Sequence, residues 1–218
     1  MIDNIVAVAA TAAAHLITGV RGDWLGCVPE ARPRIYFANH ASHGDFILIR
    51  TALPPELRKI TRPVAAADYW LKSPARRYIA VNAFNSVLID RNVITRTVDP
   101  VEPMTKALDE GASLILFPEG TRNAGPSLLL PFKRGIYYLA QRRPDVELVP
   151  VWIDNLNRVM PKGEFVPVPL LCTVTFGAPI HLEEGERKPD FCTRSRAALL
   201  ALAPEPDEET KAAKEAAR

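Results

Sequence analysis

The chain has 218 residues and a mass of 24.1 kDa, a length that favours a single domain. It is 48% hydrophobic and 24% charged, which is ordinary for a globular protein and excludes a disordered chain or a coiled coil. The 27 basic and 25 acidic residues give a net charge of +2, too small for a dedicated nucleic-acid-binding protein. Three widely separated cysteines without a CxxC motif argue against a disulfide framework or a structural zinc site.

The uncharged stretch near the amino terminus predicts the first element. Residues 5–20 contain no Asp, Glu, Lys or Arg, but a helix of this length spans only about 24 Å, less than the roughly 30 Å hydrocarbon core of a bilayer. Asp3 stands where a secretory signal would carry basic residues. The polar residues Asn4, Thr11, His15 and Thr18 share one stripe, which predicts an amphipathic helix. Such a helix packs on the domain or lies in a membrane interface, and the sequence leaves both open.

Alternating apolar runs and breakers predict the elements that follow. We expect strands at residues 35–38, 63–67, 86–89, 113–117, 147–153 and 171–176, and helices at 46–53, 69–81, 100–110, 132–143 and 190–202. Asp45 is expected to cap the first of these helices, Pro54-Pro55 to end it, and residues 154–169 to form a loop. The alternation predicts an α/β fold, a single domain with a mostly parallel central sheet flanked by helices. The expected organisation is an amphipathic helix at 1–20, the main domain at 21–203 and a charged, flexible tail at 204–218.

Charge is unevenly distributed along the chain. Between Arg21 and Arg91 there are 11 basic and 6 acidic residues. This excess suits an anionic partner, such as a phosphorylated substrate or an acidic membrane surface. The alternative is a solvated face without a partner.

Polar clusters follow three of the predicted strands directly, at residues 39–45, 90–91 and 118–122. The carboxyl ends of parallel strands line the ligand crevice of an open sheet. Three clusters rich in His, Asp, Glu and Arg at one sheet edge therefore predict a functional site there.

His40 and Asp45 are the candidate catalytic pair. A carboxylate that holds one imidazole nitrogen leaves the other to act as a general base near neutral pH. The chain has no G-x-S-x-G motif that would supply a serine nucleophile, so a substrate hydroxyl is the candidate third member. Two alternatives stay open: a structural turn histidine beside a helix cap, and a metal site made of His40, His43 and Asp45.

Arg91 and Arg122 are the candidate anion-binding residues. Two arginines at neighbouring strand ends can grip one phosphate, and Gly120 and Thr121 offer backbone amides and a hydroxyl to the same anion. Glu119 could orient an arginine or accept a hydrogen bond from a substrate hydroxyl. For Arg91 the alternative is a surface ion pair with Asp90 or Glu119.

Lys133 and Arg134 stand at the start of a predicted helix, where the helix dipole disfavours a positive charge. Lys133 is therefore a candidate ligand for an anion outside the helix. A solvated role is the alternative.

The sequence resembles the glycerolipid acyltransferases, a family that includes the 1-acylglycerol-3-phosphate acyltransferases. The resemblance covers about residues 34–180 and rests on four ordered blocks: Asn39-His40-x-Ser42-x-x-Asp45, Val87-Leu88-Ile89-Asp90-Arg91, Phe117-Pro118-Glu119-Gly120-Thr121-Arg122 and Val149-Pro150-Val151-Trp152. Two positions depart from the family pattern: Gly44 replaces a bulky apolar residue, and His43 is not part of the core motif. Both affect the expected shape of the acceptor pocket.

The resemblance implies transfer of a fatty acyl group from a thioester, on coenzyme A or acyl carrier protein, to the hydroxyl of a lysophospholipid. The first acceptor it suggests is 1-acyl-sn-glycerol-3-phosphate, and another lysolipid is the alternative. His40 would be the base and Asp45 its partner, while Arg91, Glu119, Gly120, Thr121 and Arg122 would hold the acceptor, with no metal or other cofactor. The implied location is the cytoplasmic face of a membrane. Two hypotheses from other functional classes remain as alternatives: a metal-dependent hydrolase and a non-catalytic lipid-binding module.

Overall fold

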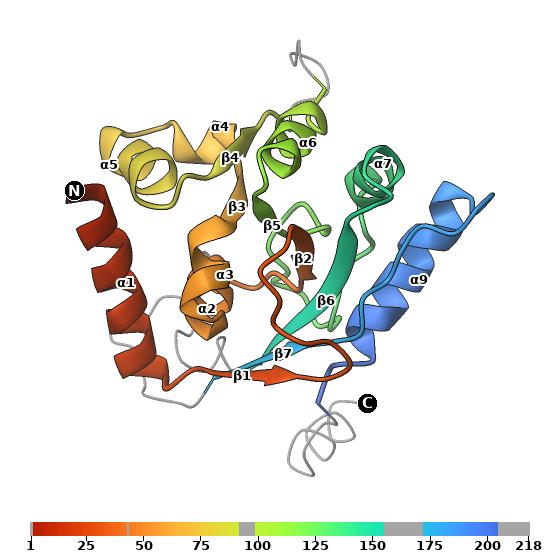
Figure 1. Ribbon diagram of the computed structural model, residues 1–218, viewed down its shortest axis with the longest axis horizontal. Helices are drawn as coiled ribbons and strands as arrows, with labels where there is room; N and C mark the ends of the chain where they lie inside the picture. Colours follow the sequence, from red (N-terminus) through yellow and green to blue (C-terminus); the bar gives the residue numbers. More distant parts are fainter. Residues whose placement is uncertain (1, 43, 92–98, 155–171, 205–218) are drawn as a thin grey trace.

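The computed structural model describes residues 2–42, 44–91, 99–154 and 172–204 of the chain. The described residues form a seven-stranded sheet in the order β1-β7-β6-β2-β5-β3-β4 (Figure 1). The strands are β1 (Arg21–Trp24), β2 (Arg34–Ala38), β3 (Thr61–Ala66), β4 (Val87–Ile89), β5 (Ser113–Leu116), β6 (Glu147–Asp154) and β7 (Thr173–Phe176). Neighbours pair in parallel except β6 and β7, so the predicted α/β fold with a mostly parallel sheet is confirmed.

Helices cover both faces of the sheet and create two apolar cores. One core lies under α1 (Ile2–Thr18), α2 (Asp45–Ala52) and the π-helix η1 (Tyr78–Ala83). The other lies under α6 (Glu102–Asp109), α7 (Gly135–Arg142) and α9 (Lys188–Leu200). Tyr36 and Phe37 on β2 point into opposite cores, because successive strand residues face opposite sides. β2 is buried along its whole length, as expected of a strand covered on both faces.

Helix α1 packs on the domain with its small residues. Ala7, Thr11 and Thr18 are buried, and each threonine hydroxyl donates to a backbone carbonyl one turn earlier. The side chains of Ile5, Val8 and Leu16 are 61%, 67% and 87% exposed. Of the predicted polar stripe, Thr11 and Thr18 therefore face the protein, while His15 and the larger apolar side chains are exposed. Within the described residues, no helix is both long and apolar enough to span a bilayer.

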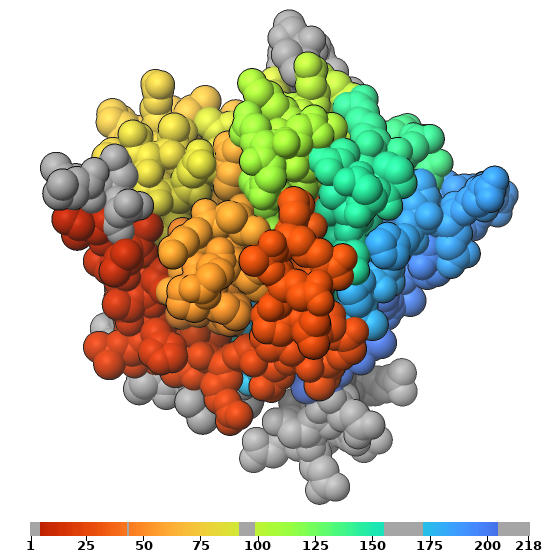
Figure 2. Space-filling view, in the orientation of Figure 1, coloured from red at the N-terminus to blue at the C-terminus, as the bar shows by residue number. Residues whose placement is uncertain are grey.

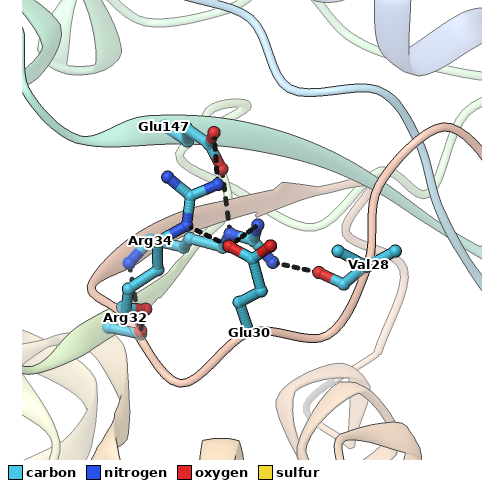
Figure 3. A network of polar contacts seen from close by, with 6 residues as sticks. Val28, Glu30, Arg32, Arg34 and Glu147 are labelled. Carbon is cyan, nitrogen blue, oxygen red and sulfur yellow. Dashed lines mark hydrogen bonds and ion pairs between the residues drawn. The ribbon is translucent and has the colours of Figure 1, made fainter.

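A network of ion pairs joins the amino ends of β2 and β6 (Figure 3). The Arg34 side chain is 1% exposed, and its Nε lies 3.0 Å from a carboxylate oxygen of Glu147. Nη2 of Arg32 lies 2.7 Å from the other Glu147 oxygen. The buried guanidinium also donates to the carbonyl of Val28 at 2.6 Å. These partners compensate a charge that would otherwise be costly to bury.

The structure corrects several predicted elements. β1 was not predicted, and neither was α3 (Pro55–Ile60), which begins at the proline expected to stop a helix. The expected helix at 69–81 is divided into α4 (Ala67–Trp70), α5 (Pro74–Arg77) and η1. Asp45 does not cap α2, because Gly44 is the N-cap and Asp45 is the first helical residue. The expected loop at 154–169 and tail at 204–218 lie almost wholly outside the described residues.

Candidate active site

The sheet order brings four polar segments to one edge. β2, β5, β3 and β4 are consecutive neighbours and run in the same direction, so their carboxyl ends are adjacent. The turn with His40 follows β2, Gly120 to Arg122 follow β5, α4 follows β3, and Arg91 follows β4. The clusters predicted to meet are therefore brought to the same edge.

His40 and Asp45 form a hydrogen-bonded pair. Nδ1 of the imidazole lies 2.8 Å from Oδ2 of Asp45. The same oxygen accepts the backbone N–H groups of Ala41 and Ser42 at 2.7 and 2.9 Å. The Asp45 side chain is 1% exposed and the His40 side chain 18% exposed, so the carboxylate is enclosed while the imidazole reaches the surface. Because Asp45 holds Nδ1, the imidazole can accept a proton at Nε2.

The His40 ring is also fixed by the loop that follows β5. It stacks on Phe117 with ring centroids 4.2 Å apart. The backbone N–H of His40 donates to Oε1 of Glu119 at 2.8 Å, and its carbonyl accepts the N–H of Asn123 at 2.7 Å. Three contacts from a second strand end therefore set the position of the imidazole.

Glu119 is a buried link between the segments of the site. Its second carboxylate oxygen accepts the backbone N–H of Leu130 at 2.8 Å, and the residue is 1% exposed. Burial raises the pKa of Glu119, and the two backbone hydrogen bonds oppose this shift. Both oxygens are thus occupied by the protein itself, and an acceptor-binding role for this side chain stays a prediction.

Arg91 is held in an ion pair with an unexpected partner. Its Nη2 lies 3.0 Å and 3.1 Å from the two oxygens of Asp68 on α4, and its Nη1 donates to the carbonyl of Gly120 at 2.8 Å. The hydrogen bond from Arg91 holds the pKa of Asp68 below its ordinary value. A surface ion pair was the alternative considered for Arg91, and the observed partner is Asp68, which the sequence did not predict.

One cavity of about 240 Å³ joins the imidazole to the arginines. Its polar lining includes His40, Arg91, Thr121 and Arg122. The apolar part of the lining includes Phe46, Val64, Tyr69, Trp70, Leu116 and Phe117. Phe46 lies in the core together with Leu48, Ile49 and Leu53, and of these four residues it alone also lines the cavity.

Gly120 gives the loop after β5 its shape. Its φ of +70° is a left-handed conformation that favours glycine, and a Cβ there would lie 3.0 Å from Cγ of Lys133. The alkyl chain of Lys133 therefore passes close to Gly120, and its backbone N–H donates to the carbonyl of Pro118 at 2.7 Å. Within the described residues, Lys133 and Glu119 fall outside the lining of the cavity.

The metal hypothesis finds no support in the part of the chain that is described. There, no three His, Cys, Asp or Glu side chains are grouped to hold a metal ion. His43, the third residue of the predicted set, lies outside the described residues.

Comparison with known proteins identifies the family. The family model described as Acyltransferase matches residues 26–154, more than half of the chain. The chain belongs to the acyltransferase family. The resemblance to the glycerolipid acyltransferases inferred from the four sequence blocks is thereby confirmed.

Relatives and a solved structure agree with this assignment. A 1-acyl-sn-glycerol-3-phosphate acyltransferase of Cocos nucifera is 29% identical over 156 residues, covering 71% of this chain and 48% of its own length. The alpha form of that enzyme from Homo sapiens is 31% identical over 141 residues, covering 62% and 46%. The chain thus spans about half the length of the curated relatives it matches. The fold matches that of the 1-acyl-sn-glycerophosphate acyltransferase PlsC of Thermotoga maritima with a TM-score of 0.68 at 20% identity, over 92% of this chain and 80% of that one.

The sequence did not predict the roles of two residues at the site, Asp68 and Asn39. Asp68 belongs to none of the four blocks, and the partner of Arg91 depends on which strands are neighbours. Asn39 was noted only as part of a block, yet its amide exchanges two hydrogen bonds with the backbone of Ile153, joining the ends of β2 and β6. An asparagine that immediately follows a buried strand is the available signal for such a bridge.

Proposed function

We propose that the protein is an O-acyltransferase that moves a fatty acyl group from a thioester, on coenzyme A or acyl carrier protein, to the hydroxyl of a lysophospholipid. The acceptor we favour is 1-acyl-sn-glycerol-3-phosphate, which would give phosphatidic acid. The observation that carries the proposal is the Asp45-bound imidazole of His40, which lines the same cavity as Arg91 and Arg122. The curated relatives, which are named 1-acyl-sn-glycerol-3-phosphate acyltransferases, support this acceptor.

His40 is the general base of the proposed reaction. The acceptor oxygen attacks the thioester carbonyl carbon while Nε2 takes the hydroxyl proton. The tetrahedral intermediate then expels the thiolate, breaking the C–S bond, and the imidazolium returns the proton to the leaving sulfur. Asp45 keeps Nδ1 protonated and stabilises the imidazolium. General base catalysis by such a group contributes typically about 10²–10⁴-fold.

The two arginines and the apolar side chains that line the cavity support a phosphorylated lipid as the acceptor. Arg91 and Arg122 provide cations in the lining of the cavity, and the phosphate would lie beside them. Tyr69, Trp70 and Phe46 offer an apolar surface to a fatty chain. Thr121 supplies a hydroxyl next to Arg122. A phosphomonoester attached to an acyl chain would match both parts of this lining.

We also propose that the protein works at a membrane surface, on the cytoplasmic face, where its lipid acceptor resides. The exposed side chains of α1 are His15 and apolar residues such as Ile5, Val8 and Leu16, and Lys72, Arg76 and Arg77 between α4 and η1 are exposed too. α1 contacts η1, so the two groups lie on neighbouring elements; Figure 2 shows the red surface of α1 and the yellow surface of this segment on the same face. Apolar side chains beside cations suit an interface rich in anionic lipid.

The activity is tested by offering the purified protein a panel of acyl thioesters and lysolipids and identifying the product by mass spectrometry. We expect His40→Ala to lower kcat by about 10²–10⁴-fold, with its circular dichroism spectrum unchanged. His181→Ala is the matched control, because His181 is exposed and outside the cavity lining.

Three outcomes would contradict the proposal. Equal thioester consumption by wild type and His40→Ala would remove His40 as the base, and no consumption by wild type would favour a non-catalytic lipid-binding module. Loss of activity in a metal chelator, restored by adding metal, would favour the metal-dependent reading.

A further inference from the structure

Asp68 and Arg91 are placed opposite each other by strand pairing. Ala66, the last residue of β3, is the register partner of Ile89, the last residue of β4, and the charged residue follows two positions later in each case, Asp68 on α4 and Arg91 directly after β4. The Nε and Nη2 atoms of Arg91 both lie within 3.3 Å of the Asp68 carboxylate, a side-on pairing. Nη1 is held separately by the carbonyl of Gly120. The guanidinium is therefore fixed from two directions.

This arrangement leaves donors for a ligand. A guanidinium has five N–H groups in a planar fork. Side-on pairing with Asp68 uses Nε–H and one N–H of Nη2, and Gly120 takes one N–H of Nη1. Among the described residues, one N–H on each terminal nitrogen is left without a protein partner, and Arg91 lines the cavity that contains His40. Two N–H groups from one fork match two oxygens of a phosphate.

The ion pair between Asp68 and Arg91 is too exposed for a contribution to fold stability to explain its presence. The side chains of Arg91 and Asp68 are 42% and 55% exposed, and pairs of this kind contribute little to the stability of a fold. The carboxylate lies on α4, whose next residues, Tyr69 and Trp70, line the apolar part of the cavity. Asp68 thus connects the helix that carries Tyr69 and Trp70 to Arg91.

We propose that Asp68 is a positioning residue that orients Arg91 to bind the phosphate of the acceptor. This inference rests on the proposed function, in which Arg91 binds that phosphate. Asp68 does not touch the acceptor. Holding the guanidinium in place before the ligand arrives removes the entropy cost of ordering a long side chain on binding.

The test is Asp68→Asn with Asp68→Glu beside it. We expect Asp68→Asn to raise the acceptor KM about three- to tenfold, which is the effect of one side chain that must be ordered on binding. kcat and the KM for the thioester should stay within twofold of wild type. Asp68→Glu, which keeps the charge, should recover part of the lost affinity. Glu110→Gln is the matched control, because Glu110 forms a similar exposed pair with Arg62.

A purely electrostatic role predicts the opposite sign. Removing a negative charge beside a phosphate would then lower the acceptor KM, so an unchanged or lowered KM overturns the inference. Calorimetric titration with sn-glycerol 3-phosphate provides a readout that does not need turnover. Weaker binding by Asp68→Asn than by wild type supports the inference, and equal or tighter binding overturns it. A wild-type protein that transfers no acyl group in the same assay refutes the proposed function, whatever the titration shows.

Discussion

The buried carboxylate of Glu119 connects two segments of the candidate site. Glu119 accepts the backbone N–H groups of His40 and Leu130, which are far apart in the chain. Its position at a strand end, between a proline and a glycine, predicted a contact with an arginine or a substrate hydroxyl. In the structure both carboxylate oxygens accept backbone N–H groups, so the side chain fixes the turn that carries His40. This role predicts a defect in folding as well as in activity.

We expect Glu119→Gln to lower the free energy of unfolding by about 1–3 kcal/mol, because an amide oxygen can replace only one of the two acceptors and leaves a buried N–H unpaired. Burial raises the pKa of Glu119, so the folded protein binds this proton more tightly than the unfolded chain does. The contribution to stability is therefore present below the ordinary pKa and is lost as the pH rises through the raised value.

Urea unfolding at several pH values measures this effect. The difference in the free energy of unfolding between wild type and Glu119→Gln should be largest at acidic pH. It should become smaller as the pH rises from the ordinary pKa of a glutamate through the raised pKa of Glu119. Glu110→Gln, in an exposed pair, should change stability by less than about 0.5 kcal/mol at every pH. A difference that widens with pH would contradict the assignment.

At the scale of single residues, sequence spacing predicted one contact of the site but not the others. The distance of five residues between His40 and Asp45 was enough to predict the pair that is observed. The cap assigned to Asp45 was wrong because its carboxylate turns back to the preceding backbone amides. Asp68 could not be predicted as the partner of Arg91, since that contact requires knowing that β3 and β4 are neighbours.

At the scale of elements, apolar strands were predictable and polar or proline-rich elements were not. β1 has the sequence Arg-Gly-Asp-Trp, which lacks an apolar run, and it is defined by pairing with β7. Pro54-Pro55 was predicted to end a helix. Proline is also favoured at the first position of a helix, and α3 begins at Pro55. Ser73-Pro74 separates α4 from α5, because the residue before proline avoids helical geometry.

The ion pairs between β2 and β6 predict a contrast between stability and activity. Glu147→Gln removes the nearer carboxylate from the 1%-exposed Arg34, which keeps Glu30 at 3.7 Å and the bond to the Val28 carbonyl. We expect the free energy of unfolding to fall by about 2 kcal/mol, the scale of a hydrogen bond to a charged group. The network lies at the amino ends of the strands, opposite the edge that carries His40, so kcat of the folded variant should be unchanged. A selective fall in kcat at full stability would contradict this separation.

At the scale of the whole molecule, α1 reverses the usual pattern of a surface helix. Its buried face carries Ala7, Thr11 and Thr18, while Val8 and Leu16 are directed outward. A surface helix normally buries its larger apolar residues, because their removal from water stabilises the fold. The polar stripe was predicted, but the side that meets the domain could not be, because small residues allow close packing against α2 and η1. The exposed apolar side chains suit a lipid surface.

We expect Val8→Gln combined with Leu16→Gln to weaken binding to vesicles at least tenfold, because each apolar side chain buried in lipid contributes about 1.5–3 kcal/mol. Arg76→Gln combined with Arg77→Gln should weaken binding only to vesicles that contain anionic lipid, and only at low salt, because exposed charges are screened. Leu128→Gln is the matched control, since Leu128 is 58% exposed on the loop between β5 and α7. Sedimentation with neutral and anionic vesicles at two salt concentrations separates the two contributions. Equal loss in the Leu128 variant, or full binding by the Val8 and Leu16 double variant, would show that α1 does not form the contact.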